Sequence, residues 1–139
     1  MQIKFIDSIE SIEKEAWDSI VNTDYPFLKH SFFLALEKAG CLTPETGWHP
    51  FYLLLFEKKS LMGLMPLFLK TNSSGEFIFD WSWADAYYRN GLNYYPKLVC
   101  SIPFTPASGP RLCLKEGIDR PKVIELILKE IMRLSDNIE

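Results

Sequence analysis

The sequence predicts one α/β domain in which helices cover a mixed, largely antiparallel sheet. Its 139 residues correspond to a single domain. Apolar residues recur at helical spacing near both ends of the chain, and short β-prone runs separated by turn residues lie between them. Strands joined by short turns pair antiparallel, so the helices are expected on the faces of the sheet.

The N-terminal part is expected to contain one strand and two helices. Gln2 to Ile6 alternates weakly in polarity and predicts a short strand. Apolar residues between Ile9 and Val21 follow helical spacing. A second helix is predicted from His30 to Ala39, because Gly40 supplies the left-handed residue that commonly ends a helix.

The middle of the chain is expected to contribute three strands. Phe51 to Glu57 and Leu61 to Lys70 are apolar runs flanking a polar turn, which indicates an antiparallel hairpin. Pro66 lies inside the second run and suggests an edge position or a bulge there. Glu76 to Trp81 is predicted as a third strand.

The last part is expected to alternate between helix and strand. Trp83 to Asn90 predicts a helix, and Tyr95 to Ile102 predicts a fourth strand. Pro103 to Pro110 cannot continue as a regular strand, since half of its residues are Pro or Gly. Asp119 is the expected cap of a final helix with Pro121 in its first turn.

Composition excludes several classes of function. The net charge is −3 and the pI about 5.4, whereas nucleic-acid modules usually carry a basic face. The longest apolar stretch, Leu61 to Leu69, is interrupted by Gly63 and Pro66 and is too short to cross a membrane. Met1 to Glu10 contains no apolar signal region, so a cytoplasmic protein with reduced thiols is expected.

Familiar catalytic and metal-binding motifs are absent from the sequence. His30 and His49 are the only histidines, which argues against a zinc site. The chain has no GxSxG, no P-loop and no GxGxxG. It also lacks the Gly-rich pyrophosphate loop expected of a coenzyme A acetyltransferase, so no cofactor site is predicted in this chain.

The segment from Phe79 to Tyr87 is the most informative part of the sequence about a functional site. It holds Asp80 and Asp85 among aromatic side chains, and eight of the twenty aromatic residues lie between Phe77 and Tyr95. Carboxylates beside flat apolar rings can form a pocket with shifted pKa values that holds a sugar or a peptide. The alternative is an aromatic core with two capping aspartates, and spacing does not decide between them.

Three further residues carry open alternatives. Lys97 could pair with an anionic ligand or form a structural ion pair with one of the two aspartates. Arg111, at the end of a Pro-rich loop, could hold a carboxylate or phosphate in a bidentate manner, or form a structural salt bridge. His30 could contact the site from a helix N-terminus or be a satisfied structural histidine.

Six motifs stand in order between residues 24 and 114: Pro26-Phe27-Leu28-x-His30-x-Phe32, Gly47-Trp48-x-Pro50, Pro66-Leu67-x-Leu69-Lys70, Gly75-Glu76-Phe77-x-Phe79-Asp80-Trp81-Ser82-Trp83-Ala84-Asp85-Ala86-Tyr87, Tyr95-Pro96-Lys97-Leu98 and Pro103-Phe104-Thr105-Pro106-x-x-Gly109-Pro110-Arg111. Together these motifs closely resemble the FemAB-like group of predicted N-acyltransferases, often described as peptidoglycan biosynthesis or recognition proteins.

The resemblance implies a GNAT-like fold over residues 1–139, as the N-terminal half of a protein with two such domains in tandem. It implies acyl or aminoacyl transfer to an amine, with acyl-CoA or aminoacyl-tRNA as donor for the full-length protein and a peptidoglycan precursor as acceptor. This chain would be the acceptor-binding half and would work with a second domain or another subunit. The alternatives are a non-catalytic muropeptide-recognition module and a structural remnant that pairs with another chain.

On this interpretation the aspartates are the expected bases or amine-binding groups. Lys97 and Arg111 would bind anionic parts of a precursor or stabilise charge. The remaining expected site residues are the aromatic walls of the cleft and one histidine: Trp81, Trp83, Tyr87, Tyr95 and His30.

Overall fold

Two antiparallel sheets form the centre of the fold. The computed structural model describes residues 1–136. The elements follow one another as β1 (Gln2–Ile6), α1 (Lys14–Val21), α2 (His30–Lys38), β2 (Trp48–Pro50), β3 (Tyr52–Glu57), β4 (Ser60–Met65), β5 (Phe68–Lys70), α3 (Trp81–Arg89), β6 (Lys97–Val99), β7 (Cys113–Leu114) and α4 (Arg120–Ser135). One sheet has the order β1-β3-β4-β7, and the other has the order β2-β5-β6.

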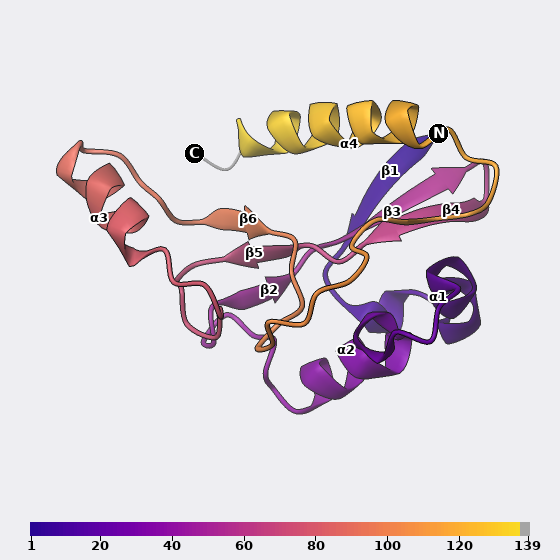
Figure 1. Ribbon diagram of the computed structural model, residues 1–139, viewed down its shortest axis with the longest axis horizontal. Coiled ribbons are helices and arrows are strands. Elements are labelled where there is room, and N and C mark those ends of the chain that lie inside the picture. The colour runs from indigo at the N-terminus through magenta and orange to yellow at the C-terminus, as the bar shows by residue number, and fades with distance from the viewer. Residues whose placement is uncertain (137–139) are drawn as a thin grey trace.

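Helices cover both faces of the larger sheet. Successive residues of β3 point to opposite faces, so Tyr52 packs in one core and Leu53 in the other. The first core includes Trp17 of α1 and Phe33 of α2, and the second includes Val123 of α4. Figure 1 shows α1 and α2 on one side of the sheet and α4 on the other. The predicted mixed α/β class is therefore confirmed, and the layers are compatible with a GNAT-like fold.

Pro66 separates the two sheets. It has no backbone N–H to donate, and it lies between β4 and β5, which belong to different sheets. On the opposite strand the chain bends at Phe51, whose N–H donates to the Leu67 carbonyl at 2.8 Å. The prediction of one continuous strand from Leu61 to Lys70 was therefore wrong, although the hairpin pairing of β3 with β4 is confirmed.

The prediction of a third strand at Glu76–Trp81 was also wrong. Residues 71 to 80 form turns and bends, and α3 begins at Trp81, two residues before the expected start. The cause is tertiary, because Lys97 donates to both Glu76 and Asp80, and Tyr94 also donates to Asp80. Figure 1 shows α3 projecting away from the sheets. We call residues 76–95 the α3 arm; no residue of α3 is buried.

The helical predictions were confirmed with one difference. The second and last helices occur as expected, and Asp119 Oδ1 accepts from the Lys122 N–H at 3.3 Å. The first helix is broken, since a short 3-10 turn at Ile9–Ser11 ends at Ile12 in extended backbone before α1 begins. Strand β2 was not predicted. All three cysteines are free, and within residues 1–136 no helix is long and apolar enough to span a membrane.

Candidate functional site

A largely buried lysine organises the candidate site. Lys97 is the first residue of β6, and its Nζ donates to Glu76 Oε2 at 2.8 Å and to Asp80 Oδ2. The three side chains are only 15%, 11% and 15% exposed, respectively. Lys97 of β6 thereby ties the middle and the end of the loop that precedes α3 to the smaller sheet.

Asp80 has its acceptor positions occupied. Its Oδ2 also accepts from the Tyr94 hydroxyl at 2.6 Å, and its Oδ1 accepts from the Ser73 hydroxyl. Ser73 is in turn hydrogen-bonded to the Tyr95 hydroxyl. Two tyrosines, one serine and one lysine are therefore linked through a single carboxylate; we call Ser73, Glu76, Asp80, Tyr94, Tyr95 and Lys97 the Lys97 cluster.

The cluster fixes the charge states of its members. Burial acts to raise the pKa of Asp80, but hydrogen bonds from Lys97, Ser73 and Tyr94 hold it well below its ordinary value. Burial acts to lower the pKa of Lys97, but its bonds to Asp80 and Glu76 raise it above its ordinary value. The hydrogen bond to Asp80, together with burial, raises the pKa of Tyr94 to about 12. At neutral pH Asp80 and Lys97 are therefore charged, and Tyr94 is a neutral donor to Asp80.

A second buried lysine lies directly beside the cluster. Lys70 of β5 lies opposite Lys97 of β6 in the smaller sheet, and Lys70 is fully buried. Its Nζ donates to the Ser74 carbonyl at 2.7 Å and lies 4.0 Å from the centre of the Trp48 ring. Burial lowers the pKa of Lys70 to about 8. The Trp48 indole N–H also donates to Ser74, so both side chains hold the loop that supplies Ser73.

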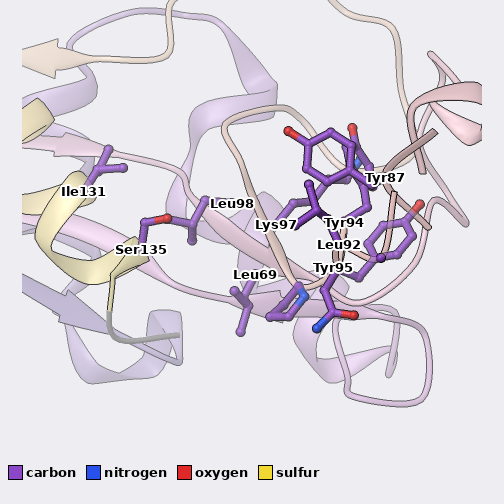
Figure 2. Close-up of a pocket in the computed structure, with 12 residues that line it drawn as sticks. Leu69, Tyr87, Leu92, Tyr94, Tyr95, Lys97, Leu98, Ile131 and Ser135 are labelled. Atoms are coloured by element: carbon purple, nitrogen blue, oxygen red, sulfur yellow. The ribbon is translucent and has the colours of Figure 1, made fainter. Parts of the chain in front are cut away.

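Two cavities adjoin the cluster. The first has a volume of about 730 Å³ and is lined by Lys97, Tyr94, Tyr95 and Tyr87 on the arm side, with Ile131 and Ser135 from α4. Figure 2 shows Ile131 and Ser135 across this cavity from the tyrosines and Lys97. We call it the tyrosine cavity.

The second cavity has a volume of about 670 Å³ and opens on the other side of Tyr95. The loop residues Ser73 and Ser74 line one part of it, and Phe79 with Trp81 lines another. The rings of Phe79 and Trp81 are stacked with their centres 4.7 Å apart. An aromatic plate next to hydroxyl groups is suited to the face of a sugar or a peptide.

The predicted site residues divide into two groups. Asp80, Lys97 and Tyr95 join in the cluster, Tyr87 lines the tyrosine cavity, and Trp81 lines the second cavity. These residues come from the N-cap position of α3, from α3 itself, from the segment after it and from the start of β6.

The other group lies apart from the cluster. Asp85 is exposed and pairs with Arg89 at 2.7 Å one helical turn away. Trp83 is 65% exposed on the arm. Arg111 donates to backbone carbonyls of its own loop, including that of Ala107 at 2.7 Å. His30 is buried, with Nε2 3.0 Å from the Ile9 carbonyl, and so lies in the packing of α1 and α2.

Several members of the site were not predicted from sequence. Glu76, Ser73 and Tyr94 were not given a role, and Lys70 was named only as part of a motif. In the predicted strand Glu76 and Asp80 would lie on one face but four residues apart along extended backbone, so their spacing did not indicate that they share a cation. Lys70 and Lys97 could have been found as lysines in otherwise apolar strands, where a buried charge requires partners.

The residues also differ in the chemistry open to them. A carboxylate whose pKa is held far below neutrality is a weak proton acceptor, which makes Asp80 suited to holding Lys97 and the tyrosines. Glu76 Oε1 is buried and has no hydrogen-bond partner among residues 1–136. The arrangement can therefore bind and orient a polar ligand through hydroxyl, ammonium and aromatic groups.

Comparison with known proteins identifies the family. Neither the curated proteins nor the solved structures include a match to this chain. A family model described as FemAB-like, peptidoglycan biosynthesis/recognition, matches residues 8–139. That match contains the whole Lys97 cluster and both cavities, and it bears out the resemblance expected from the motifs. The chain belongs to the FemAB-like family of peptidoglycan biosynthesis/recognition proteins.

Proposed function

We propose that this chain binds the amine-bearing acceptor of an N-acyl transfer reaction, a peptidoglycan precursor, in the tyrosine cavity. The observation that carries the proposal is the Lys97 cluster on the wall of that cavity, where Asp80 and Glu76 hold Lys97 beside two tyrosine rings. A rigid, ionised cluster binds a polar ligand at low entropic cost. The description of the family supplies the class of ligand.

The chemistry of such a transfer is attack of an amine on an activated carbonyl, which needs a proton acceptor and a donor to the developing oxyanion. Asp80 is a poor acceptor for the reasons above, so we give it a positioning role. The proton acceptor and the acyl donor, acyl-CoA or aminoacyl-tRNA, would then be held with the help of a second domain or another subunit.

Exposed apolar side chains on the arm support a docking partner of that kind. Ile78 is 84% exposed and Tyr88 is 81% exposed, and Phe77, Trp83 and Leu92 are also exposed. Contiguous apolar patches commonly mark protein–protein interfaces. If this proposal is correct, the purified chain should associate with itself or with a second domain, and a clean monomer with no affinity for that domain would contradict it.

The second candidate is a muropeptide-recognition module that catalyses no transfer. This candidate is favoured because both carboxylate oxygens of Asp80 already accept hydrogen bonds and its pKa is lowered. The cluster is therefore better suited to holding a polar ligand than to accepting a proton. Incubation of the chain alone with an amine acceptor and each donor class separates the two candidates. Formation of an N-acyl product would reject the recognition module, and binding without product would favour it.

A binding titration with a soluble muramyl pentapeptide tests the site itself. Tyr87→Ala removes a wall of the tyrosine cavity and should weaken binding about tenfold. Tyr88→Ala is the matched control, because Tyr88 is the next residue of α3 and lines no described cavity. Asp85→Asn should also leave binding unchanged. Equal losses for Tyr87→Ala and Tyr88→Ala, or no binding by the unmodified chain, would overturn the proposal.

A further inference from the structure

An apolar groove runs beside the tyrosine cavity, between α4 and the strands. Its volume is about 350 Å³, and its walls come from β4, β6, α4 and the segments that follow β4 and β6 or precede β7. Within residues 1–136 the lining consists of Met65, Leu67, Leu98, Cys100, Leu112, Ile124, Ile127, Leu128 and Ile131, and its side-chain heteroatoms are all sulfur. No charged side chain of this part of the chain lines the groove, so it suits a hydrocarbon ligand.

The groove adjoins the polar cavity and shares two lining residues with it. Leu98 and Ile131 line both spaces, and Figure 2 shows them on the side of the tyrosine cavity away from the tyrosines. Leu98 directly follows Lys97 in β6, so the apolar lining begins one residue after the cluster lysine. A ligand lying across Leu98 would have one end among polar groups and the other among aliphatic side chains.

The groove also exposes apolar surface that a ligand could cover. Leu128 is 55% exposed and Ile124 is 39% exposed. Cys100 is an exposed residue as well, although burial around its thiol raises the thiol pKa to about 11. The thiol therefore stays neutral at physiological pH and does not disturb the apolar character of the groove.

We propose that this groove takes the aliphatic chain of a single amphiphilic ligand whose polar head lies in the tyrosine cavity beside Lys97. The position of the head rests on the proposed function, and the position of the chain rests on the groove alone. An uncharged groove that shares a wall with a polar cavity matches the two parts of such a molecule. This inference adds a linear hydrocarbon chain to the class of ligand that the site accepts.

Chain-length dependence is the direct test. The probes are N-acylglycinamides from butanoyl to decanoyl, titrated calorimetrically at concentrations where they remain monomeric. Each methylene that enters the groove should raise the affinity about fourfold until the groove is full. Affinity that does not change with chain length would overturn the inference. Binding to phosphatidylcholine vesicles with no binding of the monomeric probes would also overturn it, since that result would indicate a membrane-docking face.

Two variants of α4 localise the chain. Leu128→Gln introduces an amide into the wall of the groove at a half-exposed position and should abolish the rise in affinity with chain length. Met132→Gln changes an exposed apolar residue one turn further along α4 that does not line the groove, and it should leave the rise intact. The same response in both variants would contradict the location.

The thiols give an independent readout. The octanoyl probe should slow alkylation of Cys100 and leave that of Cys41, which is outside the groove, unchanged. Equal protection of both thiols, or of neither, would count against occupation of the groove. The muramyl pentapeptide has no hydrocarbon tail, so Leu128→Gln should bind it normally. A failure of the chain-length series is thus distinguishable from a failure of the proposed function.

Discussion

The sheet core and the α3 arm both contain tryptophan, but they bury it to opposite extents. Trp17 and Trp48 are at most 1% exposed, whereas Trp81 and Trp83 are each 65% exposed. The first pair lies between a sheet and a covering layer, and the second lies on a helix that nothing covers within residues 1–136. Aromatic density in the sequence therefore does not distinguish a core from a surface. A tryptophan is buried only where a second layer of structure covers it.

The two regions should differ most in how much a tryptophan side chain contributes to the free energy of unfolding. Trp17→Ala removes a fully buried ring and its N–H bond to the Leu28 carbonyl, and it should lower the free energy of unfolding by about 3–5 kcal/mol. Trp83→Ala on the arm should change it by less than about 0.5 kcal/mol. Urea denaturation of both variants checks this, and a similar loss in each would show that the arm is part of the core.

The next effect contrasts a buried ion pair with an exposed one. Lys97→Ala leaves two largely buried carboxylates without their cation, so the free energy of unfolding should fall by about 3 kcal/mol. Arg89→Ala breaks the exposed pair with Asp85 and should cost about 0.3–0.5 kcal/mol. In the double variant Lys97→Met with Asp80→Asn, part of the loss should be recovered. If Lys97→Ala left the free energy of unfolding unchanged, that result would contradict the structural role of the cluster.

These contrasts also show how far the sequence alone predicts the molecule. Helical spacing placed α2 and α4, and turn residues placed the β3–β4 hairpin, because local preferences and tertiary packing agree there. The segment before Asp80 was predicted as a strand because its aromatic residues favour one. The structure makes it a loop, since Lys97, which is distant in sequence, bonds to both Glu76 and Asp80.

The site was also predictable only in part, because local motifs reveal some of its residues and contacts distant in sequence decide the others. Asp80, Lys97 and Tyr95 lie in unusual motifs and were identified, although spacing could not show that Lys97 would join Asp80 rather than Asp85. Glu76, Ser73 and Lys70 were missed because their roles depend on contacts between strands and loops. Arg111 and His30 carry suitable chemistry for a site, yet their partners are nearby backbone carbonyls.

A smaller effect should appear on acidification. The folded-state pKa of Asp80 is lowered, so its contribution to stability is present above the ordinary carboxyl pKa of about 4 and is lost as the pH falls through the folded value. Unfolding of the protein should therefore become easier below pH of about 4, and Asp80→Asn should reduce this dependence. Asp85→Asn is the control. An unchanged acid response in Asp80→Asn would mean that the carboxylate is not held by the cluster.

The smallest effect should appear in weakly alkaline solution. Because the pKa of Lys70 is lowered to about 8, the unfolded chain binds more protons above that pH, and stability should rise with pH. This gain should be on the order of 1 kcal/mol between pH values of about 8 and 9. In denaturation experiments the Lys70→Met variant should not become more stable over this pH range. The Lys4→Met variant, changed at an exposed position of β1, should still do so. A gain that persists in Lys70→Met would locate its source elsewhere.

The central claim is that the junction of the α3 arm and β6 is the ligand-binding surface. Backbone amide shifts recorded during titration with the muramyl pentapeptide test it most directly. We predict that the shifts concentrate at residues 91–98, which line the tyrosine cavity, while α1 and α2 remain unchanged. Shifts confined to α1 and α2, or no shifts at a saturating concentration of the peptide, would contradict the account.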